Sequence, residues 1–258
     1  MDFQEIAFTR TGAVGTLTLN NAGKVNALSV NMTKEIISLL TELADDDSLK
    51  VIILKAAGRH FCAGHYLAEM VDAGVKEYKM IFDQCTRMMM MIHEIPQIVI
   101  AQVQGIATAA GCQLAAWCDL IVAEEGASFS TPGVKIGLFC TTPMVAITRA
   151  IGRKMAMEML VTGREFPAAE AQALGLVNRV TPLEELDRTT AELAAQIAEA
   201  SGFALAIGKQ GLYAQADMSD SQAFHYAKHT IVMNNLAEDA QHGIKAFLEK
   251  RAPEWKNR

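Results

Sequence analysis

The chain has 258 residues, of which 51% are hydrophobic and 20% are charged, and it carries a net charge of −6 at pH 7. This balance is typical of a globular protein with a sizeable core, and the negative charge without runs of Lys and Arg argues against a nucleic-acid partner. No apolar segment reaches the roughly 18 residues of a membrane span, and the first residues lack a signal-peptide pattern, so no membrane partner is expected. Five cysteines without a CxxC pair indicate neither disulfides nor a metal site, which favours a reducing, cytoplasmic setting.

Short strands, loops and helices alternate in the N-terminal part of the chain. We expect a hairpin over residues 6–19 around Gly12, a helix capped by Ser29 that ends near residue 45, a buried strand over 51–54 and a helix over 77–92. Loops rich in small residues follow the strands, at 20–24 and again at 57–66.

The stretch from Ile98 to Ala123 is the most informative part of the sequence. It begins with an apolar, β-branched run over 98–103, typical of a buried strand, and then turns at Gln104-Gly105. The residues over 107–112 have almost no side-chain bulk and lead into a helix. A helix that starts with small residues can present its unpaired N–H groups to a ligand, for instance to a carbonyl oxygen. Close packing of the helix against a sheet explains the same residues equally well.

The alternation of strand, loop and helix continues to about residue 180, which predicts an α/β core with parallel strands. From Leu183 onward the pattern is helical, with more apolar surface than one helical hairpin can bury. Such a tail often packs against another subunit. We therefore divide the chain into a core over residues 1–195 and a helical oligomerisation region over 196–258.

Five segments in this order resemble the enoyl-CoA hydratase/isomerase family, also called crotonases, and the resemblance covers essentially the whole chain. The segments are Lys24 to Leu28, Phe61 to His65, Val103 to Leu114, Thr131 to Gly137 and Gly243 to Arg251. The resemblance implies an α/β fold built as a spiral of ββα units with a C-terminal helical trimerisation region. It also implies an acyl-CoA thioester as ligand and a homotrimer, or a homohexamer made of two trimers.

The family polarises the thioester carbonyl with two backbone N–H groups that form an oxyanion hole. Carried over by position, these donors are the amides of His65 and Ala110. Ala110 stands where the family usually has glycine, a mild change because only the N–H is used. His65 stands where the family has a small residue; its side chain either points away or acts as a base.

The resemblance also places the coenzyme A part of the substrate, and no separate cofactor is implied. Lys24, Val25 and Leu28 match the loop along the pantetheine and adenine, and Ala63 matches a residue near the adenine. Lys24 suits a phosphate, although a lone lysine in a loop is more often simply solvated. Lys250 or Lys256 could reach a phosphate on a neighbouring subunit.

Both carboxylates that hydratases of this family use for proton transfer are replaced here. Gln113 stands at the position of one glutamate and Gly133 at the position of the other, and neither residue takes a proton near neutral pH. Because each general acid or base contributes about 10²- to 10⁴-fold, we expect ordinary enoyl-CoA hydration to be severely impaired. Glu69, Asp72 or Glu77 could lean into the acyl pocket as substitutes.

Two further residues keep other chemistry open. Cys140 stands where some crotonases carry a functional aspartate; it is either a nucleophile or weak acid, or a small buried side chain. Tyr66 replaces a largely structural aspartate and is expected to shape the pocket. Two functions follow as alternatives: an enzyme of acyl-CoA metabolism that uses the oxyanion hole with few acid–base groups, or a catalytically quiet acyl-CoA-binding or assembly protein.

Overall fold

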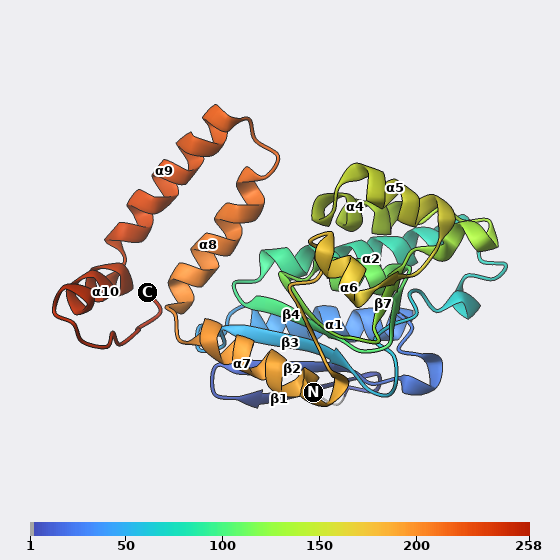
Figure 1. The fold of residues 1–258 in the computed structure, drawn as a ribbon, viewed down its shortest axis with the longest axis horizontal. Helices are drawn as coiled ribbons and strands as arrows, with labels where there is room; N and C mark the ends of the chain where they lie inside the picture. Colours follow the sequence, from blue (N-terminus) through green and yellow to red (C-terminus); the bar gives the residue numbers. More distant parts are fainter. Residues whose placement is uncertain (1–2) are drawn as a thin grey trace.

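The protein consists of a layered α/β core and three C-terminal helices that extend away from it (Figure 1). The computed structural model describes residues 3–258. In this part of the chain, no helix combines the length and the apolar character that crossing a membrane requires.

Six strands form the main sheet in the order β1-β2-β3-β4-β6-β9. Their bounds are β1 Ile6–Thr11, β2 Val14–Leu19, β3 Val51–Ala56, β4 Ile98–Val103, β6 Leu120–Glu124 and β9 Arg179–Thr181. The first two strands form an antiparallel hairpin whose turn includes Gly12, and the later neighbours are all parallel. The predicted hairpin and the parallel core are therefore confirmed.

A second, smaller sheet has the order β5-β7-β8, with β5 Ile106–Thr108, β7 Ser128–Ser130 and β8 Phe166–Pro167. Residues 107–112 were predicted to lead directly into a helix, but residues 106–108 form the strand β5 before α3 begins. This strand is made by distant partners, because Ala107 pairs with Phe129 of β7 and bridges to Cys62. Small residues gave no local signal for such a pairing.

Helices and 3-10 turns cover the sheets and connect the strands. The helices of the core are α1 Val30–Leu43, α2 Val75–Glu94, α3 Ala110–Trp117, α4 Thr141–Ala150, α5 Arg153–Thr162, α6 Ala168–Ala173 and α7 Leu186–Ala198. The 3-10 turns are η1 Ala22–Lys24, η2 Leu67–Glu69, η3 Pro132–Ile136 and η4 Leu183–Glu185. The Ser29 side chain accepts the Met32 N–H at the start of α1, as predicted.

The two faces of the main sheet bury different side chains because successive residues of a strand point to opposite sides. On one face Ile52 and Leu54 of β3 join the large core beneath α1, α2 and α3. On the other face Val51 and Ile53 pack against Leu193 and its neighbours on α7. The continuously apolar central strands therefore bury side chains on both faces of the sheet. Helices cover both faces and so fix the ends of these strands in place.

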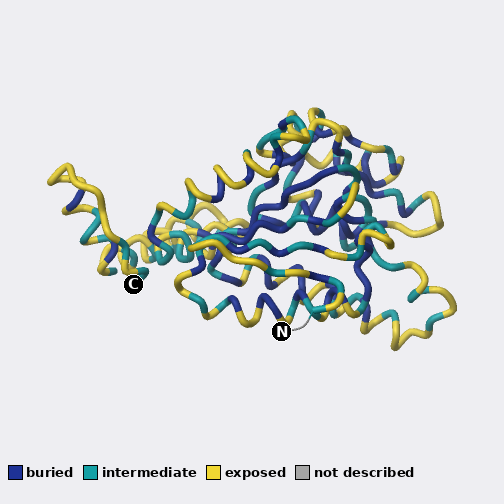
Figure 2. The backbone as a smooth tube through the Cα atoms, turned by 90° about the horizontal axis from the view of Figure 1, so that it is seen from below, coloured by how far each residue is buried: buried dark blue, intermediate teal, exposed yellow. Residues whose placement is uncertain are grey.

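The C-terminal helices are α8 Gly202–Gln215, α9 Asp220–Leu236 and α10 Glu238–Leu248. They project from one end of the core (Figures 1 and 2). Most residues of α9 are exposed, whereas most residues of α8 are half-buried. Large apolar side chains of α9, among them Phe224 and Leu236, are uncovered in the single chain. The predicted division after residue 195 falls inside α7, and the helices that leave the core begin with α8.

Candidate functional site

A cavity of about 840 Å³ lies between the loop after β3, the start of α3 and the segment from η3 to α4. Five of the ten predicted site residues line it: Ala63, His65, Ala110, Gly133 and Cys140. Its volume is in the range of small-molecule sites. The other five do not line this cavity: Lys24, Val25, Leu28, Tyr66 and Gln113.

The amides of His65 and Ala110 both belong to residues of the cavity wall, and no hydrogen-bond acceptor for either N–H occurs within residues 3–258. The two segments are held together by backbone bonds, since the Thr108 N–H donates to the Cys62 carbonyl at 3.0 Å. Their approach depends on Gly64, where a Cβ would lie 3.0 Å from the Ala110 nitrogen. Two unpaired donors are thereby brought to one place.

Ala109, the residue before the second amide, has an unusual backbone conformation with φ 52° and ψ −120°. L-residues seldom occupy this region, and such conformations cost of order 1–3 kcal/mol each. The conformation is held by the surroundings, because the Ala109 N–H donates to the Ser130 carbonyl of β7 at 2.9 Å. Because of this turn, α3 begins at Ala110 with an N–H that donates to no acceptor in the described part of the chain.

Asn26 joins the loop after β2 to the loop after β3, a role that the sequence analysis did not identify. It is fully buried, its Oδ1 accepts the Asn21 N–H at 2.9 Å, and its Nδ2 donates to the carbonyls of Ala57 and His60. Its φ of 51° lies in the left-handed region, which asparagine tolerates better than most residues. The sequence offered only an asparagine after a Lys-Val pair in a loop, which does not by itself predict a buried residue that joins two loops.

The residues assigned to coenzyme A contact lie on these joined loops. Lys24 places its Nζ 4.3 Å from the ring centre of Tyr66, and the Val25 carbonyl accepts the Ala63 N–H. The Leu28 side chain is buried, and its backbone pairs with the segment of His65. Leu28 can therefore meet a ligand only through a change in the loop, whereas Lys24 and Tyr66 are accessible.

The His65 ring packs edge-on against Phe82 of α2, with ring centres 5.1 Å apart. Its Nε2 is buried without a hydrogen-bond partner among the described residues, and burial lowers its pKa to about 4. The ring is therefore neutral near pH 7. Because an effective general base has a pKa near the working pH, this geometry disfavours His65 as a base.

Gly133 and Cys140 lie next to each other in the cavity wall, whereas Gln113 of α3 does not line the cavity. A Cβ on Gly133 would lie 2.7 Å from the Leu138 carbonyl oxygen and 2.9 Å from Sγ of Cys140. Burial raises the pKa of the Cys140 thiol, which keeps it protonated near neutral pH. Gln113 is buried, and its Oε1 has no partner within residues 3–258.

No Asp or Glu side chain of the described chain lines the cavity. Glu69 is used elsewhere, because its Oε2 accepts the Val30 N–H at the start of α1 at 3.0 Å. Asp72 and Glu77 are exposed outside the lining, and Lys256 pairs with Glu238 on α10. Residues 3–258 contain no cluster of three His, Cys, Asp or Glu side chains placed to hold a metal ion.

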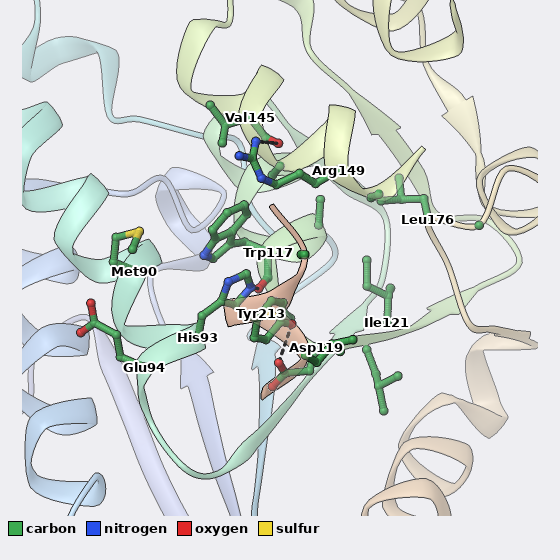
Figure 3. Close-up of a pocket in the computed structure, with 18 of the residues that line it drawn as sticks. Met90, His93, Glu94, Trp117, Asp119, Ile121, Val145, Arg149, Leu176 and Tyr213 are labelled. Atoms are coloured by element: carbon green, nitrogen blue, oxygen red, sulfur yellow. Dashed lines mark hydrogen bonds between the residues drawn. The ribbon is translucent and has the colours of Figure 1, made fainter. Parts of the chain in front are cut away.

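A second cavity, of about 1100 Å³, lies where α8 meets the ends of α2 and α3 (Figure 3). His93 is stacked between Trp117 and Tyr213, at ring-centre distances of 4.1 and 3.5 Å. The Tyr213 hydroxyl donates to Asp119 at 2.7 Å. Nε1 of Trp117 is buried without a partner within residues 3–258, but the other polar groups named here are paired. Although this cavity is larger, the two unpaired backbone amides make the first cavity the better candidate for a site.

Comparison with known proteins gives a consistent result across the chain. Residues 9–258 match the family described as "Enoyl-CoA hydratase/isomerase". Enoyl-CoA hydratase domain-containing protein 3, mitochondrial, of Mus musculus is 42% identical over 243 residues, which cover 94% of this chain and 81% of the relative. A probable enoyl-CoA hydratase of Mycobacterium tuberculosis is 33% identical over 262 residues, with both chains covered completely.

Solved structures agree with the sequence comparison. An enoyl-CoA hydratase of Mycobacterium smegmatis superimposes with a TM-score of 0.96 at 43% identity, covering 98% of this chain and 99% of that chain. Human enoyl-CoA hydratase domain-containing protein 3 gives a TM-score of 0.95 at 41% identity, covering 98% and 100%. Residues 107–115 and 131–140 by themselves resemble this branch of the family, and the comparisons confirm that likeness.

One expectation from the sequence has to be corrected. The mouse, rat, zebrafish and human relatives are named mitochondrial, which contradicts the cytoplasmic setting expected above. The physical reason is that unpaired cysteines, all five of which are free here, indicate a reducing environment and do not distinguish one reducing compartment from another. The chain belongs to the enoyl-CoA hydratase/isomerase family and has the crotonase fold.

Proposed function

We propose that the first cavity binds an acyl-CoA thioester and that the N–H groups of His65 and Ala110 hold its carbonyl oxygen. The observation that carries this proposal is the pair of unpartnered amides on residues of the same cavity wall. The names of the relatives, which are enoyl-CoA hydratases or proteins with that domain, point to the same ligand class. Coenzyme A enters as part of the substrate, and the proposal needs no further cofactor.

Donors fixed in advance toward a developing negative charge are effective in a water-poor site. Removing one such donor costs about 3 kcal/mol in known cases, so two donors can stabilise an enolate strongly. The absence of a side chain at Gly64 lets its loop lie directly against Ala109 and Ala110, which brings the two amides to the same wall. Binding and carbonyl polarisation therefore need only the backbone that this chain provides.

Proton transfer is where this chain differs from a standard hydratase. The positions of the usual carboxylates hold Gln113 and Gly133, and no carboxylate of residues 3–258 lines the cavity. We propose that hydration of an enoyl thioester is slower by about 10²- to 10⁴-fold for each missing group. The reaction that remains accessible is one that uses carbonyl polarisation with few acid–base groups, such as thioester hydrolysis or isomerisation.

The second candidate is a catalytically quiet acyl-CoA-binding or assembly protein. The buried, protonated Cys140 and the weakly basic His65 favour it, because neither group is suited to proton transfer near pH 7. In either case we propose that the apolar side chains exposed on α9 are covered in a homotrimer or homohexamer.

Hydration of crotonyl-CoA by the purified protein tests the proposal, together with a titration of crotonyl-CoA binding. A hydratase of the same family that has both glutamates serves as the positive control. We expect clear binding and a hydration rate at least about 10²-fold below the control. Hydration comparable to the control would overturn the argument from the carboxylates, and failure to bind the thioester would overturn the ligand assignment.

A further inference from the structure

The cavity with the unpaired amides opens between two surface segments that carry apolar side chains. We call them the 67–71 rim, with Leu67, Met70 and Val71, and the 136–139 rim, with Ile136, Leu138 and Phe139. Apart from Met70, these residues are between 43% and 69% exposed. Clustered exposed apolar side chains at a cavity mouth usually mark a binding groove.

Both rims are fixed in place, so the exposure is a built feature of the fold. The 67–71 rim is held by Glu69, whose Oε2 accepts the Val30 N–H, and by Tyr78, whose hydroxyl donates to the Met70 carbonyl at 2.7 Å. In the 136–139 rim, Gly137 takes a φ of 79° and the Leu138 N–H donates to the Gly133 carbonyl at 2.9 Å. The turn exposes large apolar side chains to water, where polar side chains would be more favourably solvated.

Two hydroxyl groups of the lining are engaged inside the protein. The Tyr78 hydroxyl is used on Met70, and the Thr108 hydroxyl pairs with Ser130 at 2.8 Å. The His65 ring, which is neutral near pH 7, packs against Phe82, and both residues line the cavity. Lys135 is the one cation among the described lining residues, and it is exposed on the stretch leading to the second rim.

On this basis we propose that the acyl group taken by this site is an unbranched alkyl tail of medium length or longer, which lies between the two rims. The proposal rests on the proposed function, since it starts the tail at the amides of His65 and Ala110. A two- to four-carbon acyl group would leave the rims uncovered, whereas a longer tail removes them from water.

Binding of saturated acyl-CoA esters tests this directly. Butyryl-, octanoyl- and dodecanoyl-CoA are titrated below their micelle concentrations by calorimetry, with free coenzyme A as reference. Burying one methylene group improves affinity by up to about fourfold, so we expect a stepwise tightening from the shortest to the longest ester. Equal dissociation constants for the three esters would overturn the inference and leave the proposed function standing. Absence of binding by all three would overturn the proposed function itself.

Val71→Ser on the rim and Val161→Ser on α5 form a matched pair, since both valines are exposed and only Val71 lines the cavity. We expect Val71→Ser to weaken dodecanoyl-CoA by about fivefold with little effect on butyryl-CoA, and Val161→Ser to change neither. If Val71→Ser instead altered only the oligomeric state, the rim would be covered by a second copy of the chain and the inference would fail.

Lys135 makes it possible to distinguish an alkyl tail from a tail that ends in a carboxylate. A tail that ends in a carboxylate would pair with this cation, so suberyl-CoA, with a terminal carboxylate, is compared with octanoyl-CoA. We expect octanoyl-CoA to bind more tightly and Lys135→Met to leave its affinity unchanged. Tighter binding of suberyl-CoA, lost in Lys135→Met, would replace the alkyl tail by a dicarboxylic acyl group.

Discussion

Nζ of Lys209 on α8 lies 2.7 Å from Oδ2 of Asp119, which stands just before β6, and the two side chains are only 1% and 9% exposed. The ammonium also donates to the carbonyls of Ile92 and Gln97, both at 2.6 Å, so all three of its protons are used. Asp119 in turn accepts the Val99 N–H and the Tyr213 hydroxyl. This buried pair fixes α8, and through it the helices that leave the core, to the ends of α2 and β4.

Replacing Lys209 by methionine should destabilise the protein strongly. The variant leaves the Asp119 carboxylate and two carbonyls buried without their partner, and breaking a buried ion pair from one side typically costs about 3–5 kcal/mol. Lys55→Met is the control, because Lys55 pairs with Asp187 at side-chain exposures of 29% and 77%. We expect a loss of at most about 1 kcal/mol there. Free energies of unfolding from urea titrations decide the matter, and equal losses in both variants would contradict the assignment.

Parts of this architecture follow from the sequence because their causes are local. Ser29 could be assigned as a helix cap and residues 98–103 as a strand since the capping oxygen and the apolar run act on their immediate neighbours. The strand β5 and the Lys209–Asp119 pair depend on segments far apart in the chain. No local pattern distinguishes a lysine that will be buried from one that stays in water.

The site shows the same division. The resemblance of the loops to a family indicated which backbone amides to examine, and the structure places the residues of both on one cavity wall. The resemblance did not indicate that Leu28 is buried, that Asn26 holds the two loops together, or that the His65 ring is neutral. The last two properties depend on partners that the linear sequence does not place nearby: the carbonyls of Ala57 and His60 for Asn26, and the Phe82 ring for His65.

Gly133→Ala should be destabilising although it adds a single methyl group. The new Cβ would lie within 3 Å of both the Leu138 carbonyl and Sγ of Cys140, and the carbonyl belongs to a fixed turn. Overpacking of this kind typically costs about 1–3 kcal/mol. Gly23→Ala is the control, because nothing lies within 4 Å of its Cβ position. Thermal unfolding of the two variants should show a lower Tm only for Gly133→Ala; an unchanged Tm would mean that the turn yields easily. If the prediction holds, a glutamate cannot be restored at this position without rebuilding the turn.

Acid should destabilise the protein through His65. Its pKa is about 4 in the folded chain, against 6.5 as the ordinary value, so the unfolded chain binds a proton that the folded chain does not. Stability is therefore complete above about pH 6.5 and is lost as the pH falls toward 4, by at most about 3 kcal/mol from this residue. In His65→Phe the slope of unfolding free energy between these values should decrease. It should not vanish, because burial lowers the pKa of His93 to about 4 as well.

The control for the acid effect is His229→Gln, since His229 is exposed on α9. Urea titrations at several pH values between 7 and 4 give the slope for each variant. A slope that is the same in His65→Phe and in the unmodified protein would show that the ring is already solvated enough to take up its proton in the folded state.

Asn26→Ala should affect both stability and ligand binding. The substitution removes three hydrogen bonds of about 2.9 Å and leaves the Ala57 and His60 carbonyls and the Asn21 N–H without their partner. Leaving buried groups unsatisfied costs about 1–3 kcal/mol each, and alanine is also unfavourable at a φ of 51°. Because Lys24 and the segment of His65 are held relative to one another by this residue, affinity for butyryl-CoA should fall as well.

Asn26→Gly separates the two effects, since glycine accepts the left-handed backbone but makes no side-chain bonds. We expect it to recover only the part of the stability that comes from backbone strain, and to bind butyryl-CoA as weakly as the alanine variant. Calorimetric titration at a temperature where both variants remain folded provides the comparison. Full affinity in Asn26→Gly would mean that the backbone conformation alone, without the bonds to Ala57 and His60, keeps the two loops in register.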